Sequence, residues 1–367
     1  MLKLKILVLI ALIGFGCKEK PVAINFQQNF KGHITEGQSK LIYAESKAFF
    51  NQTQLSFAII QNGKPNFYGV KIENDTLLSV ENKDRVFEIG SISKVFTATL
   101  LADLTLKGKL NLDDPASKYL PWKLKNKPEF TLQQLSNHTS GLPRLPNNLI
   151  LSEIDMANPY KDYSEEKLAQ YLTEQLELAQ DPGLKFDYSN LGVGLLGYIL
   201  TKVDSSSYEE MVQSRIARPF HMDATTTNGE RVKNQLVTGL NVEGGGTPNW
   251  DLNVLEGAGA ILSSTKDLNK FALAQFNPEN QALAITQKQT FSITAYENAI
   301  GLGWMIQNRK NGRWLNHGGG TGGYTSSFTM DVEKKNAVII LSNVSAFSKN
   351  SVNISNLGLR LMEIIED

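Results

Sequence analysis

The sequence predicts an α/β (α+β) fold in which an antiparallel sheet, flanked by helices, stands beside a mostly helical region. Segments rich in β-formers lie near both ends of the chain, at 55–70 and 324–341. Between them, at about 92–250, apolar residues recur at helical spacing. Strands at both ends with helices between them indicate one sheet closed by the two ends of the chain, with a helical region inserted.

The first strand is predicted at 55–60, where apolar and β-branched residues are concentrated. Asn62 and Gly63 follow, a pair typical of a tight hairpin turn, because both residues tolerate the positive φ that such a turn needs. Residues 67–70 are then the returning strand. This N-terminal hairpin is the first element of the predicted sheet.

The end of the sequence mirrors this arrangement. Segments 324–330 and 337–341 are rich in β-formers, and a polar turn at 334–336 separates them. A last helix is predicted from about 352 to 366. Its apolar face is expected to consist of Leu357, Leu361 and Ile364.

Composition and charge are those of an ordinary globular protein. The 367 residues are 41% hydrophobic and 20% charged, and 37 basic residues balance 37 acidic ones. Since no excess of one sign attracts a polyanion, we expect no nucleic-acid partner. The most basic short run, 123–127, is interpreted as a solvated loop rather than a binding patch.

The first 17 residues have the layout of an export signal. Lys3 and Lys5 precede an apolar run at 6–15, which is too short to span a bilayer as a helix. Cys17, the one cysteine of the chain, follows at once. This layout resembles a bacterial lipoprotein signal, although Gly14 stands where such signals usually carry leucine, so plain secretion is the alternative.

The resemblance implies that residues 1–16 are removed and that Cys17 becomes a lipidated first residue. Residues 17–35 would be a tether, and 36–367 the folded domain. We therefore expect an exported protein of the cell envelope, anchored by lipid to a membrane and facing the periplasm or the exterior.

Ser91 and Lys94 form the first candidate for chemistry. Residues three apart share one face of a helix, so the lysine amine would lie beside the serine hydroxyl. Serine is a weak nucleophile that needs a base, and burial lowers the pKa of a lysine until it can act as one. A serine in the first turn also gains from the helix dipole, and its N–H could face a developing oxyanion.

The Ser-x-x-Lys spacing alone is not specific, because it recurs at 164–167 and 263–266. Those two segments are interpreted as ordinary helix N-caps with charged surface turns. Ser91 differs because an apolar helix, beginning at about Val95, follows and would bury the pair. A simple N-cap remains the alternative at this point.

Tyr188 and Asn190 form the second candidate. They follow a turn at 182–183 and precede an apolar helix that begins at Leu191. A tyrosine near a buried lysine can have its pKa lowered and can shuttle a proton, and an asparagine amide can orient a substrate carbonyl. The alternative is an aromatic residue at a junction between loop and helix, and the same spacing recurs at 296–298.

The third candidate is the glycine-rich segment 317–323, which begins with His317. Glycines let a strand edge approach a ligand closely, because a Cβ would block it. The N–H of Gly320 could supply half of an oxyanion hole. A flexible turn is the alternative, and a phosphate cradle is excluded because no helix follows the glycines.

In this order and spacing, the three segments resemble class C β-lactamases and the related penicillin-binding proteins and esterases. The resemblance extends from about residue 40 to 360. It includes further matching stretches at 131–142, at 257–259 with 263–268, and at 301–304. It implies a β-lactamase/transpeptidase-like fold and a covalent acyl-enzyme, with no cofactor.

The resemblance assigns a role to each matching residue. Ser91 is the acylated nucleophile and Lys94 its proton partner. Tyr188 is a general base in acylation and deacylation, and Asn190 contacts the substrate amide. The N–H groups of Ser91 and Gly320 form the oxyanion hole.

The triplet His317-Gly318-Gly319 is implied to bind substrate, but it departs from the class C pattern. His317 stands where class C β-lactamases carry the lysine of Lys-Thr-Gly. A histidine here is similar to some D-alanyl-D-alanine peptidases, esterases and broader β-lactamase-like proteins. A neutral imidazole attracts a carboxylate less than an ammonium does, so the departure weakens the case for a true β-lactamase.

The other histidines have structural interpretations. His138 lies in a stretch that packs a turn, His221 at a helix end and His33 in the tether. The chain has four histidines, one cysteine and no His-Glu-x-x-His spacing. We therefore expect no catalytic metal.

Three functions follow from these observations. The first is a serine hydrolase acting on a small-molecule or peptide substrate, through amide, peptide or ester bonds. The second is a true class C β-lactamase, and the third is a non-enzymatic penicillin-binding sensor or scaffold. Steady turnover of a β-lactam would indicate the second, and a penicillin adduct that persists for hours would indicate the third.

Overall fold

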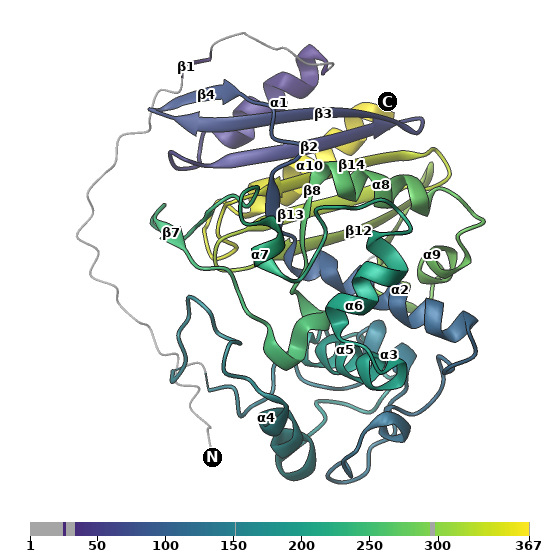
Figure 1. Cartoon of the computed structure of the whole chain (residues 1–367). Coiled ribbons are helices and arrows are strands. Elements are labelled where there is room, and N and C mark those ends of the chain that lie inside the picture. The colour runs from purple at the N-terminus through teal and green to yellow at the C-terminus, as the bar shows by residue number, and fades with distance from the viewer. Residues whose placement is uncertain (1–24, 27–33, 151, 294–297, 367) are drawn as a thin grey trace, which may run out of the picture.

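Both ends of the described sequence build the sheet. The computed structural model describes residues 25–26, 34–150, 152–293 and 298–366; the predicted signal, Cys17 and most of the predicted tether lie outside this part. Strand β2 (Gln54–Gln61) pairs antiparallel with β14 (Asn336–Ser342). In Figure 1 the purple strands of the beginning accordingly lie beside the yellow strands of the end. The predicted pairing of the two ends is confirmed.

The described residues form a ten-stranded sheet in the order β1-β4-β3-β2-β14-β13-β12-β11-β10-β9. Its neighbours are antiparallel except for β1 with β4. The other strands are β1 (Asn25–Phe26), β3 (Lys64–Glu73), β4 (Thr76–Ser79), β9 (Phe291–Ile293), β10 (Asn298–Ile300), β11 (Met305–Arg309), β12 (Gly312–Gly320) and β13 (Thr325–Asp331).

The predicted hairpin between β2 and β3 is confirmed. Asn62 and Gly63 have φ values of 51° and 75°, the two positive values of a type I′ turn. Their N–H groups are bonded to the next turn of the sheet, at Asn336 Oδ1 (2.9 Å) and Lys335 O (2.8 Å). The N-terminal hairpin is thus joined to the β13–β14 hairpin by its turn as well as by the strands.

Helices cover both faces of the sheet. α1 (Glu36–Ser46) and α10 (Val352–Glu366) pack together, with α10 against β13 and β14, whereas α8 (Thr265–Gln275) packs against β2 and β14. The predicted face of the last helix is partly wrong. Leu357 and Leu361 are buried, but Ile364 is 38% exposed and Ile365 lies inside in its place. Ile365, four residues after Leu361, faces the sheet, whereas Ile364, three residues after it, faces away from it.

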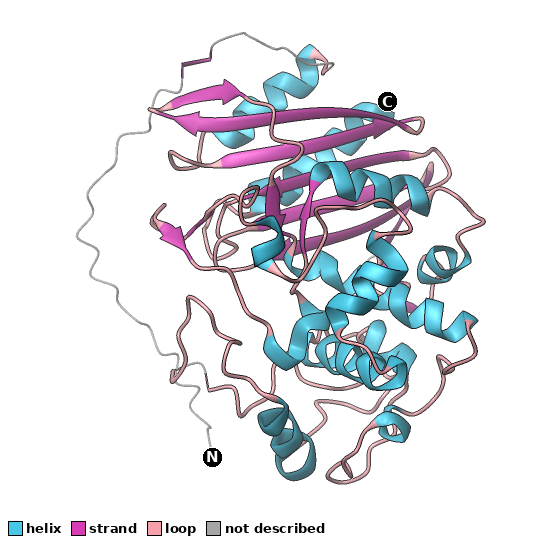
Figure 2. Cartoon of the chain, viewed as in Figure 1, coloured by secondary structure: helices cyan, strands magenta, loops and turns pink. Residues whose placement is uncertain are grey.

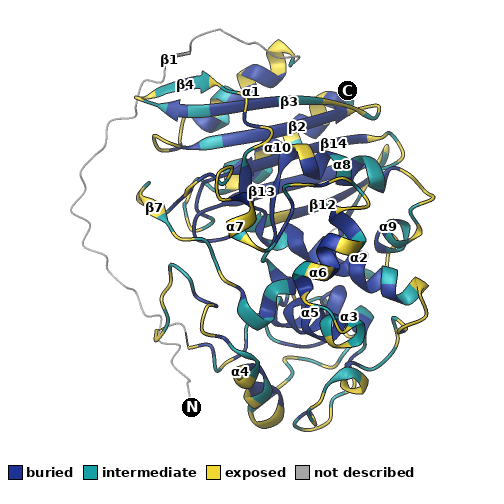
Figure 3. Ribbon diagram, viewed as in Figure 1, coloured by how far each residue is buried: buried dark blue, intermediate teal, exposed yellow. Residues whose placement is uncertain are grey.

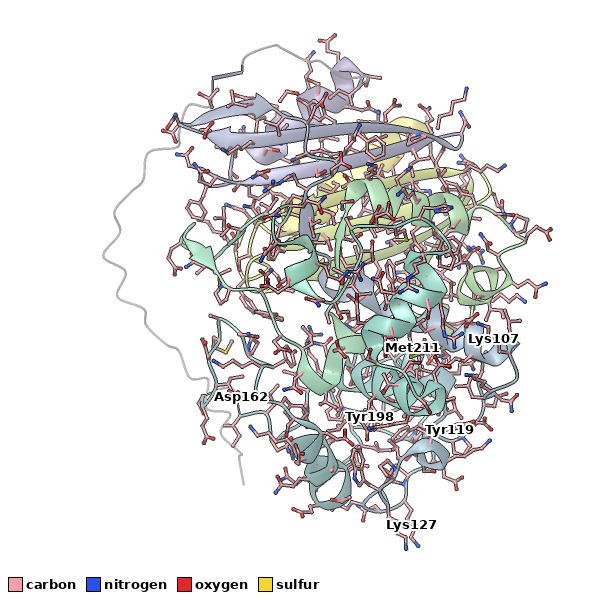
Figure 4. The ribbon with its side chains drawn as sticks, viewed as in Figure 1. Lys107, Tyr119, Lys127, Asp162, Tyr198 and Met211 are labelled. Carbon is pink, nitrogen blue, oxygen red and sulfur yellow. The ribbon has the colours of Figure 1, made fainter. Side chains whose placement is uncertain are left out.

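Most of the helical region lies in the lower half of Figure 2, below the sheet in that view. Its centre is α2 (Ser93–Leu106), which is buried on almost every side and appears dark blue in Figure 3. It packs against α3 (Leu132–Ser136), α5 (Asn190–Asp204), α6 (Tyr208–Val212) and α9 (Gln281–Thr286). Two further short helices are α4 (Glu165–Gln170) and α7 (Gly229–Val232). Tyr198, labelled in Figure 4, stacks on Trp122 at 5.3 Å in this region.

Two short segments connect the sheet to the helical region and position the site. The pair β5 (Val86–Glu88) and β8 (Leu262–Ser264) leads into the 3₁₀ turn η1 (Gly90–Ile92), which continues as α2. The segment η5 (Asn253–Ala258) lies against α5, where a Cβ on Gly197 would come within 2.8 Å of the Cα of Gly257. This close approach brings the end of η5 to the start of α2. Nowhere in the described ranges is a helix both long and apolar enough to cross a membrane.

Candidate active site

Ser91 lies in η1, at the junction between sheet and helical region, and Lys94 lies one turn later in α2. Lys94 Nζ is 3.0 Å from Ser91 Oγ. Gly90 has φ +51°, a left-handed conformation that turns the chain from β5 into the helix at little cost for glycine. The spacing of three residues therefore brings the amine to the hydroxyl as predicted.

Lys94 is fully buried, and its second bond is donated to the carbonyl oxygen of Ala258 at 2.7 Å. No carboxylate forms an ion pair with it within the described part of the chain. Burial, together with the positive charge of Arg144, holds the pKa of Lys94 well below its usual range. The amine is therefore suited to accept a proton from Ser91.

Tyr188 lies in the loop before α5, and its hydroxyl is hydrogen-bonded to Ser91. The centre of its ring is 5.0 Å from Lys94 Nζ. The expected lowering of the Tyr188 pKa is wrong: burial raises it to about 12, more than the bond to Ser91 lowers it. The phenol is thus protonated near neutral pH, and it can pass a proton on only while it receives another.

His138 supports Tyr188 from behind. The two rings lie 4.3 Å apart, and His138 Nδ1 accepts a bond from Ser189 N at 3.2 Å. The imidazole is buried, and this burial lowers its pKa well below the usual value, with Lys94 adding to the effect. His138 does pack a turn, as the sequence indicates, but that turn belongs to the site. The sequence alone carried no signal for this contact.

Asn190 begins α5 and lines the same cavity as Ser91. Its Nδ2 donates to the hydroxyl of Tyr160 at 3.2 Å, which fixes the orientation of the amide. Its Oδ1 is buried and has no partner in the described structure. A buried acceptor without a partner is costly, so this oxygen lowers the stability of the folded site.

His317 lies on β12 and also lines the cavity, with its ring 6.3 Å from that of Tyr188. Its Nδ1 lies 2.7 Å from the carbonyl oxygen of Gly318. Since a carbonyl only accepts, Nδ1 holds the proton and Nε2 is an acceptor. Burial and the nearby Lys94 lower the pKa of His317 to about 4, so the ring is neutral at neutral pH.

The glycines of β12 divide between two tasks. The hairpin bond from Thr321 N to Tyr324 O, 2.9 Å long, sets the alternation along the strand. In an antiparallel ladder this alternation turns the backbone of Gly319 toward β13, and that of Gly318 and Gly320 toward the other edge. At that edge β12 pairs with β11 only as far as Asn316, which lies opposite Met305. The N–H of Gly320 therefore faces η1 rather than another strand.

The cavity contains Gly318 and Gly320 in its wall but not Gly319. A Cβ on Gly319 would collide with the carbonyl oxygen of Ile89 and with Ser326 Oγ, which itself donates to Ile89 O at 2.9 Å. Similarly, a Cβ on Gly90 would lie 2.6 Å from Gly320 N. The absence of side chains at Gly90 and Gly319 thus lets β12 pack closely against the backbone of residues 89–90, just before Ser91. The sequence predicts a close approach to a ligand only.

Gly319→Ala is accordingly expected to lower the free energy of unfolding by about 2 kcal/mol, because backbone atoms must separate to admit the methyl group. Urea unfolding measures this loss. Gly318→Ala is the matched control, since its Cβ would meet nothing closer than 3.5 Å. Equal stability of the two variants would contradict a tight junction between β12 and the segment before Ser91.

The cavity has a volume of about 680 Å³ and is walled by both halves of the fold. The sheet side contributes Met305 and the β12 residues, and the helical side contributes loops before α4, α5 and η5. Most of the lining is apolar or aromatic: Leu145, Leu149, Met156, Pro159, Tyr160, Phe186, Trp250, Met305, Ala346 and Phe347. Sequence reasoning missed these residues and Arg144, because isolated positions in separate loops form no pattern.

A buried carboxyl group holds one of these loops in place. Glu88 Oε1 accepts bonds from Trp250 N (2.7 Å) and Asn249 Nδ2 (2.8 Å). Burial raises the pKa of Glu88. Glu88 is the last residue of β5, and only Ile89 separates it from η1, so the strand that leads to Ser91 also carries the residue that fixes Trp250 in the cavity wall.

The two remaining histidines do not line the cavity as described. His221 is exposed, with φ +57°, after the helical turn Gln213–Ala217, and His33 lies outside the described residues. Throughout the described ranges, no three His, Cys, Asp or Glu side chains are grouped so that they could hold a metal ion.

Known proteins resemble this chain over most of its length. A family model described as Beta-lactamase matches residues 51–355. Protein flp of Staphylococcus aureus (strain MRSA252) is 27% identical over 335 residues, which cover 86% of this chain and 61% of that protein. The chain thus matches about three fifths of the length of that relative. A beta-lactamase of Pseudomonas fluorescens is 27% identical over 258 residues, 68% of each chain.

Two solved structures share the fold. A beta-lactamase/D-alanine carboxypeptidase from Pseudomonas syringae superposes with a TM-score of 0.72 at 22% identity, covering 89% of this chain and 99% of that one. An octameric penicillin-binding protein homologue from Pyrococcus abyssi gives 0.71 at 25% identity, covering 88% and 75%. The fold is therefore of the β-lactamase/transpeptidase-like type, as predicted, and with the family model matched over residues 51–355 the chain belongs to the Beta-lactamase family.

Proposed function

We propose that this protein is a serine hydrolase that cleaves an amide, peptide or ester bond through an acyl-enzyme on Ser91. The observation that supports this most directly is the 3.0 Å contact between Ser91 Oγ and the buried amine of Lys94. A buried amine with a lowered pKa is a competent base, and a hydroxyl bonded to it is an activated nucleophile.

In the acylation step, the Ser91 proton passes to Lys94 Nζ while Oγ forms a bond to the substrate carbonyl carbon. The N–H groups of Ser91 and Gly320 stabilise the resulting oxyanion. Collapse breaks the bond to the leaving group, which takes a proton from Lys94 through the hydroxyl of Tyr188. This relay fits a phenol whose pKa, about 12, keeps it protonated.

In the second step, water attacks the acyl carbon, and its proton passes to the same Tyr188–Lys94 pair. The ester bond to Ser91 breaks, the acid product leaves, and the serine hydroxyl is restored. Asn190, which lines the cavity, would contact the amide of the substrate, and His317 Nε2 would accept a donor. Gly318 contributes to the cavity wall, whereas Gly319 acts through its packing against Ile89.

The test is intact-mass measurement after exposure to a penicillin, a D-alanyl-D-alanine peptide and a short-chain activated ester. We expect a transient adduct of the acyl mass and repeated turnover for at least the ester. Absence of both adduct and turnover with the whole panel would sink the proposal. An adduct that persists for hours on every substrate would instead support a penicillin-binding sensor.

Hydrolysis of β-lactams as the main activity is the narrower alternative, and the state of His317 argues against it. The family lysine would offer a cation to the β-lactam carboxylate, but His317 is neutral with a pKa of about 4. Steady turnover of nitrocefin at rates above those for the ester would favour that alternative.

We also propose that the protein is exported and lipid-anchored through Cys17, as supported by the charge and hydropathy pattern of residues 1–17. Cys17→Ser is expected to move the protein from the membrane pellet to the supernatant and to remove the acyl mass from its N-terminal peptide. Fractionation and peptide mass measure the two effects. Ser91→Ala, which leaves the leader unchanged, should remain in the pellet; a Cys17→Ser protein that also stayed there would contradict the anchor.

A further inference from the structure

The cavity beside Ser91 contains one charged side chain among the described residues that line it, and that residue is Arg144. Its guanidinium carbon lies 5.2 Å from the centre of the Tyr188 ring, whose hydroxyl is bonded to Ser91. Its carbonyl oxygen accepts bonds from Asn190 N (3.0 Å) and Leu191 N (3.2 Å). The start of α5 therefore fixes the backbone of Arg144 at the cavity wall.

Arg144 differs from the arginines that serve structure. Arg215, for example, forms ion pairs with Asp103 at 2.7 Å and Asp204 at 2.5 Å. In the described ranges, no carboxylate forms an ion pair with Arg144, and no Asp or Glu lines the cavity. A guanidinium is charged at every physiological pH and matches a carboxylate with two parallel donors.

The two other basic groups near Ser91 cannot supply this charge. Lys94 is buried and bonded to Ser91 and Ala258, and burial lowers its pKa. His317 donates Nδ1–H to Gly318 O and is neutral at neutral pH. Attraction for an anion thus comes from the loop wall rather than from β12, where the resemblance would place it.

The rest of the loop wall is apolar and reaches the surface. Met156 and Phe347 are 49% and 57% exposed, although both line the cavity, and Trp250 lies 6.2 Å from Phe347. Large apolar side chains left in contact with water at a cavity mouth are typical of binding surfaces. They favour an aromatic or branched aliphatic group on the substrate.

Resting on the proposed hydrolase function, we infer that Arg144 determines specificity by binding a carboxylate on the substrate. The preferred substrates are esters or amides that combine a bulky apolar group with a carboxylate placed against the loop wall. The neutral His317 then accepts a donor from the substrate instead of holding its anion.

The test uses two matched pairs of esters, each with a carboxylate member and an isosteric carboxamide member. In the first pair the group is on the acyl part: the mono-4-nitrophenyl ester of 3-phenylglutaric acid and its carboxamide. In the second pair it is on the leaving group: the 4-carboxyphenyl and 4-carbamoylphenyl esters of 3-phenylpropionic acid. Because each variant is compared with wild type on the same ester, differences in intrinsic reactivity cancel.

Arg144→Gln is expected to raise KM for the carboxylate member of at least one pair by about tenfold, with kcat little changed. KM for both carboxamides should change less than about twofold. Arg144→Lys should recover part of the loss. Arg218→Gln removes the same charge from an exposed position away from the cavity, and it should match wild type on all four esters.

The outcomes separate this inference from the proposed function. Equal effects of Arg144→Gln on carboxylates and carboxamides would show a structural role, through Tyr188 or α5, and would overturn the inference. No effect on any ester would do the same. If wild type forms no Ser91 adduct with any of the four esters by intact mass, the proposed function fails, and the inference fails with it.

Discussion

Purified Ser91→Ala is expected to form no acyl adduct and to lose at least about 10⁴-fold in kcat/KM on an activated ester. In the proposed mechanism the Ser91 hydroxyl forms the covalent bond, and it is the hydroxyl that lies 3.0 Å from Lys94 Nζ. Stability should hardly change, because the side chain is only partly buried at the cavity wall. Intact mass, ester turnover and urea unfolding measure the three quantities.

Ser164→Ala is the matched control for this experiment. It removes the serine of a second Ser-x-x-Lys segment, at the N-cap of α4, and should leave ester turnover as in wild type. Turnover by Ser91→Ala near the wild-type rate would remove the assignment of the nucleophile. If Ser91→Ala retained turnover and formed an adduct on another serine, the protein would still be a serine hydrolase, but with a different nucleophile.

The three Ser-x-x-Lys segments show what the sequence could distinguish. In segment 263–266 the N-cap of α8 is Ser264, whereas Ser263 is buried in β8 with its Oγ 2.8 Å from Thr225 Oγ1. Lys266 forms an exposed ion pair with Asp84 at 2.6 Å. Ser164 is likewise an N-cap. At Ser91 the next turns of the helix are apolar, so the lysine is drawn into the core and is fully buried. The apolar residues that follow Ser91, which can be seen in the sequence, therefore distinguish the lysine that becomes buried from the other two.

The sheet was predictable for a similar reason. Alternation, turn residues and strand length are local properties, and the Asn62-Gly63 turn alone fixes the β2–β3 register. The face that α10 turns toward the sheet could not be predicted from its own sequence. Leu361 and Ile365 face the sheet while Ile364 remains exposed, because packing against β13 and β14 selects the buried face.

The cavity wall could not be predicted, since its members are separated by long stretches of chain. Arg144, Trp250 and Phe347 lie in three loops that follow no period. Glu88 fixes Trp250 through two hydrogen bonds, a relationship that no spacing indicates. The Ser91–Lys94 pair is therefore predictable from a short segment, whereas the loops that wall the cavity, on which the proposed specificity rests, are brought together only by the structure.

Lys94→Met is expected to lower kcat/KM by about 10³-fold while raising the free energy of unfolding at pH 7 by about 1 kcal/mol or more. Activity falls because the base beside Ser91 is gone. Stability rises because burial, which lowers the pKa of Lys94, also opposes folding of the protonated side chain. Methionine fills similar space without a charge, although Ala258 O loses its donor at 2.7 Å.

The stability gain should depend on pH in one direction. An unfolded lysine holds its proton up to a pKa of about 10.4, whereas folded Lys94 releases it at lower pH. Between the two pKa values the unfolded state binds more protons, so wild-type stability rises with pH and the advantage of Lys94→Met shrinks toward pH 10.

Lys266→Met, which removes an exposed amine, is the control and should show neither the gain in stability nor the loss of activity. Urea unfolding of the three proteins from pH 6 to 10 measures the effect. A Lys94→Met protein less stable than wild type at pH 7 would mean that the site bears no burial penalty, and the argument for a neutral amine beside Ser91 would fail.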